Sequence, residues 1–250
     1  MITKIIFLLL AMLNPLIALS QDRVILTTGE YPPLNMENDK HSGLIPRIVL
    51  EAFKAEGIEV EYRFVPWKRA FIESAEGKVH GTIQWLHSDE RAKTHHYSKP
   101  IMMEKYVWFY KKSAPIVYDG QLSSLENYTL GAVNGYTYNK QFLDAIANKS
   151  LKVNLVNSID QNINMLMSGR IDTLIENLDV ALYTLEHQFP NEVKNISYGD
   201  KALVEVPNHL LLSKKHDNST EIMAKFNSGL DKIKQNGLYQ RILDESRSSD

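Results

Sequence analysis

The chain has 250 residues, a formal net charge of −2 at neutral pH and no cysteine. A nearly neutral charge with both signs interspersed argues against nucleic-acid binding and against a polybasic membrane-binding surface. The lack of cysteine excludes disulfides, thiolate chemistry and a lipid anchor on an N-terminal cysteine. It also leaves histidine and carboxylate side chains as the available zinc ligands.

The first twenty residues have the pattern of a signal peptide. Lys4 supplies the positive charge, residues 5–13 are apolar, and Ala18-Leu19-Ser20 is a small-x-small cleavage site. The apolar run is too short for a membrane anchor, which needs about 20 residues. We therefore expect residues 1–20 to be removed on export to the periplasm. A mature chain of roughly 230 residues fits one large domain or two small ones.

The first half of the mature sequence predicts a βαβαβ arrangement. Residues 24–28 form a strand that ends in a loop containing Tyr31-Pro32-Pro33, and the prolines present Tyr31. Apolar residues at helical spacing predict a helix that begins near Pro46 and ends before Gly57. The remaining expected elements are a strand over 60–65, a helix over 66–77 and a strand up to Ile83. This order is typical of a mostly parallel sheet with helices on its faces.

The middle of the sequence predicts a short helix and then a crossing between two parts of the molecule. Ser88 precedes Asp89-Glu90-Arg91 and suits a helix N-cap. Residues 103–110 form an aromatic-rich strand, and the break at 113–115 follows it. We interpret this strand as a connection between two lobes.

The second half repeats the pattern of the first. Gly169 to Ile175 matches Gly77 to Ile83, and polar or aromatic residues follow each run (Gln84-Trp85 and Glu176-Asn177). The expected strands are 128–133, 151–156 and 171–175, and the expected helices lie around 142–146, 160–167 and 178–188. Because ligands of open α/β sheets bind beyond the carboxyl ends of the strands, two such halves indicate a ligand held between lobes.

The last part of the chain predicts a return crossing. Residues 202–213 form a β run that Pro207 is expected to interrupt, and residues 221–242 form a long amphipathic helix with a break at Asn236-Gly237. The tail from residue 246 is expected to fray. The two crossings predict lobe 1 over residues 22–107 plus 208–250 and lobe 2 over residues 108–207, joined by two hinge strands.

Several short motifs carry a resemblance to a known family. They are Tyr31-Pro32-Pro33-Leu34, Ser42-Gly43-Leu44, Ser88-Asp89-Glu90-Arg91, Tyr97-Ser98-Lys99-Pro100, Leu130 to Gly135, Gly169-Arg170-Ile171-Asp172 and Asn236-Gly237-Leu238-Tyr239. In this order and spacing the sequence resembles the family 3 extracytoplasmic solute-binding proteins, the amino-acid type of bacterial periplasmic binding protein. The resemblance covers essentially all of the mature chain.

The resemblance implies a two-lobed α/β fold of the type II periplasmic-binding-protein kind. It implies a monomer without cofactor, metal or enzymatic activity that captures a small polar or anionic ligand, amino-acid or organic-acid like, in the cleft between lobes. The ligand would pass to an ABC transporter permease or a membrane receptor. Two alternatives stay open. One is a dehydratase-like enzyme on the same fold, with Glu30 or Glu176 as its acid. The other is a ligand sensor that acts through a separate receptor.

The resemblance also implies a set of ligand-binding residues: Tyr31, Trp67, Trp85, Ser88, Arg91, Tyr136, Thr137 and Asn177. Arg91 would bind a ligand carboxylate bidentately, unless it is a surface arginine paired with Asp89 or Glu90. Ser88 would bind the same carboxylate or serve as a helix cap.

The other implied contacts come from both halves. Thr137 lies in a loop expected to open a helix, where free N–H groups favour an anion. Its alternative role is that of a helix cap. Tyr31, Trp67 and Trp85 would line the pocket.

Asn177 departs from the family pattern. Amino-acid binders of this family place an aspartate here to hold the ligand's ammonium group, and asparagine offers no charge. Glu176 is not expected to replace it, because neighbouring residues on a strand point to opposite faces. The sequence therefore predicts a ligand without a free α-ammonium, such as an organic acid. His87, His95 and His96 are close in sequence, but capping or exposed roles are favoured over a metal site.

Overall fold

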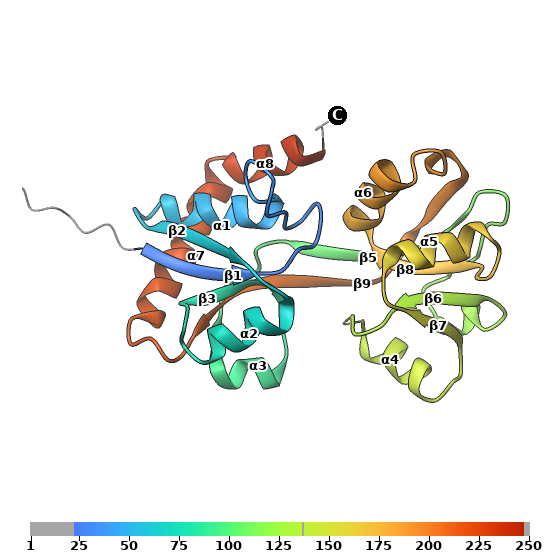
Figure 1. Ribbon diagram of the computed structural model, residues 1–250, viewed down its shortest axis with the longest axis horizontal. Coiled ribbons are helices and arrows are strands. Elements are labelled where there is room, and N and C mark those ends of the chain that lie inside the picture. The colour runs from blue at the N-terminus through green and yellow to red at the C-terminus, as the bar shows by residue number, and fades with distance from the viewer. Residues whose placement is uncertain (1–22, 137, 248–250) are drawn as a thin grey trace, which may run out of the picture.

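The computed structural model describes residues 23–247 except Thr137, so the expected signal peptide lies outside the described residues. Figure 1 shows two α/β lobes joined by two long strands, β5 (Met103–Lys111) and β9 (Ile196–Ser213). This is the two-lobed α/β architecture that the sequence predicts. In the part of the chain that is described, no helix has the length and apolar character needed to cross a membrane.

Lobe 1 contains the N-terminal βαβαβ unit and the C-terminal helices. Its strands are β1 (Arg23–Thr28), β2 (Glu59–Phe64), β3 (Gly81–Leu86) and β4 (His95–Tyr97), and its helices are α1 (Leu44–Lys54), α2 (Trp67–Ala75), α3 (Asp89–Thr94), α7 (Ser219–Gln235) and α8 (Leu238–Arg247). β1 lies parallel to both β2 and β3. The apolar stripe of α1, including Ile45, Val49 and Phe53, is fully buried, as the helical spacing predicts.

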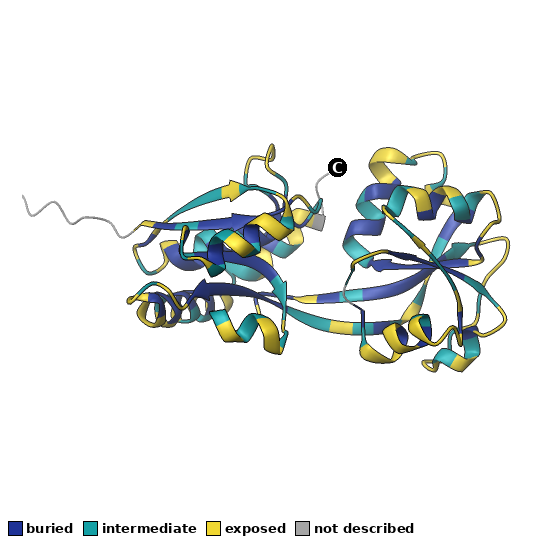
Figure 2. Cartoon of the chain, turned by 60° about the horizontal axis from the view of Figure 1, so that its bottom comes forward, coloured by how far each residue is buried: buried dark blue, intermediate teal, exposed yellow. Residues whose placement is uncertain are grey.

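Lobe 2 repeats the arrangement on a smaller scale. Its strands are β6 (Thr129–Val133), β7 (Lys152–Val156) and β8 (Thr173–Asn177), and its helices are α4 (Lys140–Ala147), α5 (Ile159–Met167) and α6 (Leu178–Gln188). Two 3-10 turns, Leu122–Leu125 and Val193–Asn195, flank them. β6 lies parallel to β7 and β8. In Figure 2 the inner strands of both lobes are mostly buried, whereas the edge strands β2 and β7 are partly exposed and the helices expose their outer faces.

The two sheets share one strand. Residues 208–213 of β9 pair with β3 and β4 in lobe 1, whereas residues 196–207 pair with β5, which in turn pairs with β8 in lobe 2. The hydrogen-bonded path therefore runs continuously from β2 to β7 through the crossing strands. The lobe boundaries drawn from the sequence stay a prediction.

Pro207 does not interrupt β9, contrary to expectation. It pairs with Met103 of β5, and the pairing of β9 with β3 begins only at Asn208. With a partner strand on one side only, the strand can accommodate a residue that lacks an N–H. The break expected at Asn236-Gly237 is confirmed, because Gly237 with φ +78° separates α7 from α8.

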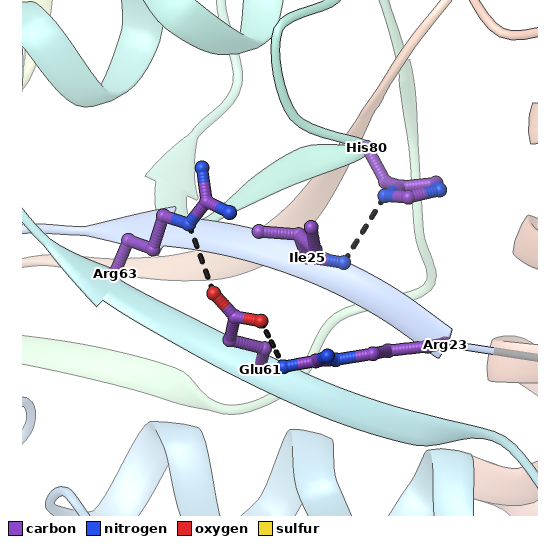
Figure 3. A network of polar contacts seen from close by, with 5 residues as sticks. All are labelled: Arg23, Ile25, Glu61, Arg63 and His80. Atoms are coloured by element: carbon purple, nitrogen blue, oxygen red, sulfur yellow. Dashed lines mark hydrogen bonds and ion pairs between the residues drawn. The ribbon is translucent and has the colours of Figure 1, made fainter.

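Polar contacts join β1 to its neighbours at the outer edge of lobe 1 (Figure 3). Glu61 on β2 bonds both Arg23 of β1 and Arg63, the latter at 3.0 Å. The backbone N–H of Ile25 donates to Nδ1 of His80 at 3.1 Å. Because Nδ1 accepts here, this geometry needs His80 to be neutral.

Candidate functional site

Tyr31 links the two lobes. It lies in the loop after β1, where its backbone bridges to Asn35, and its hydroxyl lies 3.4 Å from Oε1 of Glu176 at the end of β8. Its ring contacts that of Tyr136 edge to face, with 6.1 Å between centroids. Val180 of α6 is also part of the apolar cluster of lobe 1. The carboxyl ends of β1 and β8 therefore meet between the lobes, where the sequence predicts the ligand.

Glu176 is a buried carboxyl group without a cationic partner among the described residues. It is fully buried, and Oε1 accepts from the backbone N–H of Asn177 at 2.8 Å as well as from Tyr31. Oε2 has no hydrogen-bond partner. Burial, the largest cause, and the nearby Glu104 together raise the pKa of Glu176 to about 8, although the hydrogen bonds from Asn177 and Tyr31 lower it.

The sequence did not lead us to expect that Glu176 replaces the missing aspartate, and whether it does so stays a prediction. Its backbone does alternate with Asn177, but β8 ends at Asn177. The carboxyl group of Glu176 reaches the hydroxyl of Tyr31. Alternation along a strand fixes the direction of Cβ and not the position of a carboxyl group three bonds away.

Four tyrosines surround Glu176. Tyr31, Tyr136, Tyr138 and Tyr106 form a continuous series of ring contacts with centroids 6.1 to 6.4 Å apart. Burial is the largest cause that raises the pKa of each phenol, and the charge of Glu176 also raises it. One tyrosine belongs to lobe 1, two follow β6, and Tyr106 lies on the crossing strand β5. The rings give the carboxyl group an aromatic and poorly solvated environment.

Both polar atoms of the Asn177 side chain form hydrogen bonds within the protein. Its Oδ1 caps α6 by accepting from the N–H groups of Asp179 and Val180, at 3.0 and 3.3 Å. Its Nδ2 donates to Oε2 of Glu104 at 3.1 Å. A ligand contact by Asn177 stays a prediction, and the structure gives this side chain a capping role.

Glu104 on β5 is the site residue that the sequence analysis missed. Its Oε1 accepts from Asn208 at 2.9 Å and from Gln84 at 3.4 Å, whereas Oε2 accepts from Asn177 and Tyr106. Gln84 adopts the left-handed conformation with φ +63° at an irregularity of β3. A lone acid in an aromatic strand gives no sequence signal, because three of its four donors come from distant parts of the chain.

An aromatic cluster with one cation lies at the start of α2 and the end of β3. Trp67 and Trp85 contact each other edge to face at 5.5 Å, and the Arg91 guanidinium lies 4.8 Å from the centre of the Trp85 ring. Trp67 also donates to the backbone carbonyl of Glu30, next to Tyr31, at 3.3 Å. Trp67, Trp85 and Arg91 are thus brought together, and Trp67 lies beside the loop that carries Tyr31.

Arg91 and Ser88 both form hydrogen bonds within the protein, and their ligand-binding roles stay predictions. Arg91 donates to the carbonyl of Leu86 at 3.0 Å and forms no ion pair with a described residue, while Glu90 pairs with Lys93 instead. Ser88 is the N-cap of α3, with Oγ accepting from the Arg91 N–H at 3.2 Å.

Two further candidates, Thr137 and His95, lie outside the described residues or in a place other than expected. Thr137 is not described, and α4 begins at Lys140 with Asn139 as its cap rather than at the loop after β6. His95 is buried between the hydroxyls of Ser74 and Thr94, both at 2.9 Å. Over the described ranges 23–136 and 138–247, no three histidine or carboxylate side chains group as a metal site.

Solved structures share this fold. A histidine kinase sensor domain similar to periplasmic binding proteins is 17% identical with a TM-score of 0.70, covering 91% of this chain and 97% of its own. An ancestral arginine-binding protein bound to arginine is 22% identical with a TM-score of 0.68, covering 89% and 97%. The arginine-, lysine-, histidine-binding protein ArtJ from Geobacillus stearothermophilus is 20% identical with a TM-score of 0.64, covering 90% and 94%. At these identities the likeness shows the fold alone.

A search of the curated proteins finds no match. The family model of the bacterial extracellular solute-binding proteins, family 3, matches residues 24–246, which is nearly all of the described chain. The fold of the chain agrees with this match. So does the contact between the carboxyl ends of β1 and β8 at Tyr31 and Glu176. The chain belongs to the bacterial extracellular solute-binding proteins, family 3, a solute-binding family whose members are extracytoplasmic.

Proposed function

We propose that this protein captures a small polar solute of amino-acid size between its lobes in the periplasm and delivers it, as a monomer, to an ABC transporter. The observation that carries the proposal is the contact of Tyr31 in lobe 1 with both Glu176 and Tyr136 in lobe 2. A side chain that bridges the lobes is placed to sense their separation, and hinge closure around a ligand needs such contacts. The solved arginine-binding relatives support a ligand of this size.

Arg91 is the proposed carboxylate-binding residue. Its guanidinium forms no ion pair with a described residue and is only half-buried, while the Trp85 ring supports one face of it. A planar guanidinium with a free edge binds a carboxylate through two parallel hydrogen bonds. A solute with a carboxylate would therefore be held by lobe 1 at Arg91 and covered by lobe 2.

We propose no catalytic role. Glu30, one of the two acids considered for an enzyme, is exposed and accepts from the backbone N–H of Glu37 at 2.7 Å. It caps its own loop and does not reach the junction between the lobes. Transport is preferred over sensing because the family match is to extracellular solute-binding proteins.

A thermal-shift screen of amino acids, polyamines, organic acids and small sugars tests the proposal. A true ligand at about 100 times its Kd stabilises the protein by roughly 2.7 kcal/mol, which raises Tm by about 5–11 °C for a chain of this size. The Tyr31→Ala variant should fold but lose this response. A screen in which no compound raises Tm, or an unchanged response of the Tyr31→Ala variant, would contradict the proposal.

A further inference from the structure

We propose that the hydroxyl of Tyr97 positions Arg91 for a carboxylate solute by holding the turn over residues 86–88, which connects β3 to α3. This inference rests on the proposed function, because it adds a positioning residue to the same site. In this role Tyr97 acts through Arg91 and needs no contact with the solute.

The phenol oxygen of Tyr97 bonds both ends of this turn. It accepts from the backbone N–H of Ser88 at 3.2 Å and donates to the backbone carbonyl of Leu86 at 3.4 Å. Arg91 depends on the same two residues. Its Nη1 donates to the Leu86 carbonyl at 3.0 Å, and its backbone N–H donates to Oγ of Ser88 at 3.2 Å. One hydroxyl therefore fixes the two groups that hold the side chain and the backbone of Arg91.

Tyr97 is anchored in the sheet of lobe 1 independently of its hydroxyl. It is the last residue of β4, and all three residues of β4 pair with β9. The ring of Tyr97 contacts those of His87 and His209, with 4.8 and 5.5 Å between centroids. Removal of the phenol oxygen should therefore leave the backbone and the ring in place, and it should free only the turn.

Helix α3 needs such a contact because apolar packing does not hold it. The helix has six residues, none of which is buried, and a helix of this length is marginal on its own. In its C-terminal half, Lys214 donates to two of its carbonyl groups, from the backbone at 3.0 Å and from Nζ at 2.6 Å. At its N-terminal end, from which Arg91 extends, Tyr97 bonds the cap residue Ser88.

A fixed turn favours the binding of a carboxylate. An oriented guanidinium can form two parallel hydrogen bonds to a carboxylate at once, whereas a mobile one must first be ordered, which costs affinity. Loss of the Tyr97 hydroxyl should therefore weaken solutes whose carboxylate reaches Arg91 and spare compounds that lack a carboxylate.

The test compares acids with their amides in the Tyr97→Phe variant, which keeps the ring and loses only the oxygen. The pairs are L-arginine with L-argininamide, glutarate with glutaramide, and any carboxylate that raises Tm in the screen with its primary amide. Isothermal titration of the mature protein gives the Kd of each compound. We expect the unmodified protein to prefer the acid, and the variant to bind the acid roughly 5- to 30-fold more weakly and the amide about equally well.

Two further variants separate positioning from stability. Tyr62→Phe on β2 removes another hydroxyl of lobe 1, which donates to the Pro46 carbonyl at 2.6 Å outside the turn, and it should keep the preference for the acid. Arg91→Lys keeps the charge and removes the planar fork. In the Arg91→Lys background, Tyr97→Phe should weaken the acid much less than it does in the unmodified protein, because residues that act together are not additive.

The two proposals fail differently. If no compound of these pairs or of the thermal-shift screen binds the unmodified protein, the proposed function itself is wrong. If solutes bind but none of them through a carboxylate, the solute-binding function stands and the role of Tyr97 is overturned. The same holds if Tyr97→Phe leaves the acid unchanged, weakens acid and amide equally, or weakens the acid equally in the Arg91→Lys background.

Discussion

The side chains of Asn208 and Glu104 join the two strands that connect the lobes. Nδ2 of Asn208 on β9 donates to Oε1 of Glu104 on β5 at 2.9 Å, and both residues are buried. The other oxygen of Glu104 accepts from Asn177 and Tyr106, which belong to the lobe 2 side of the crossing. One carboxylate therefore holds donors from both sides of the hinge.

Glu104→Gln should destabilise the fold by about 1–3 kcal/mol. Glutamine offers one acceptor oxygen, so its NH₂ group must face two of the four donors in either orientation. Urea unfolding of the purified variant measures the loss. The control is Glu205→Gln, an exposed acid on β9, which should change stability little. Equal stability of the two variants would show that the carboxylate is not needed.

Arg91→Ala should leave the fold intact and remove binding of any carboxylate solute found in the screen. Its side chain contacts only the Leu86 carbonyl and the Trp85 ring among the described groups, so little stability is at stake. Loss of one partner of an ion pair in a binding site typically costs about 2–5 kcal/mol of affinity. Titration calorimetry compares it with Lys93→Ala on the same helix, which should bind normally. An unchanged affinity of the Arg91→Ala variant would show that Arg91 does not bind the solute.

Gln84→Gly should be more stable than Gln84→Ala by about 1 kcal/mol. Both variants lose the 3.4 Å hydrogen bond to Glu104, but only glycine adopts φ +63° without strain. The difference in Tm between the two variants measures the cost of the left-handed backbone conformation at residue 84. If alanine were equally stable, the left-handed conformation at this position would not persist in solution.

The contribution of His95 to stability should be lost between about pH 6.5 and pH 4. Burial lowers the pKa of His95 to about 4. The unfolded chain binds a proton at this histidine before the folded chain does, so the contribution of His95 to the free energy of unfolding falls as pH falls. A loss of about 1 kcal/mol would lower Tm by about 2–4 °C.

Melting curves across the pH range check this prediction. His187→Gln, at an exposed histidine, should keep the slope of Tm against pH, and His95→Gln should make this slope less positive between pH 4 and pH 6.5. An equally steep slope in both variants would exclude His95 as a source of the pH dependence.

Local patterns in the sequence predicted much of the fold. The spacing of apolar residues located α1 and its buried face, and the Ser88-Asp89-Glu90-Arg91 motif located the cap of α3. These features depend on residues within a turn or two of each other, where geometry follows from sequence alone. The prediction that Pro207 interrupts the strand was wrong, because a strand accommodates a proline or not according to which neighbouring strands pair with it.

The site was predicted less well because it is built from distant residues. Glu104 is held by donors 2, 20, 73 and 104 positions away, and Glu176 meets Tyr31 across 145 positions. Arg91 and Trp85 were recognised because a motif carries them, but the packing of one on the other follows only from the structure. Side-chain direction at a strand end is likewise set by tertiary contacts.

The interlobe distance with and without solute tests the central claim most directly. The chain has no cysteine, so Lys40→Cys in lobe 1 and Glu186→Cys in lobe 2, both exposed, give two defined sites for spin labels. Double electron–electron resonance should give a shorter, narrower distance distribution with a solute that raises Tm, and a longer or broader one without it. A distribution that stays the same when that solute binds would contradict capture between closing lobes.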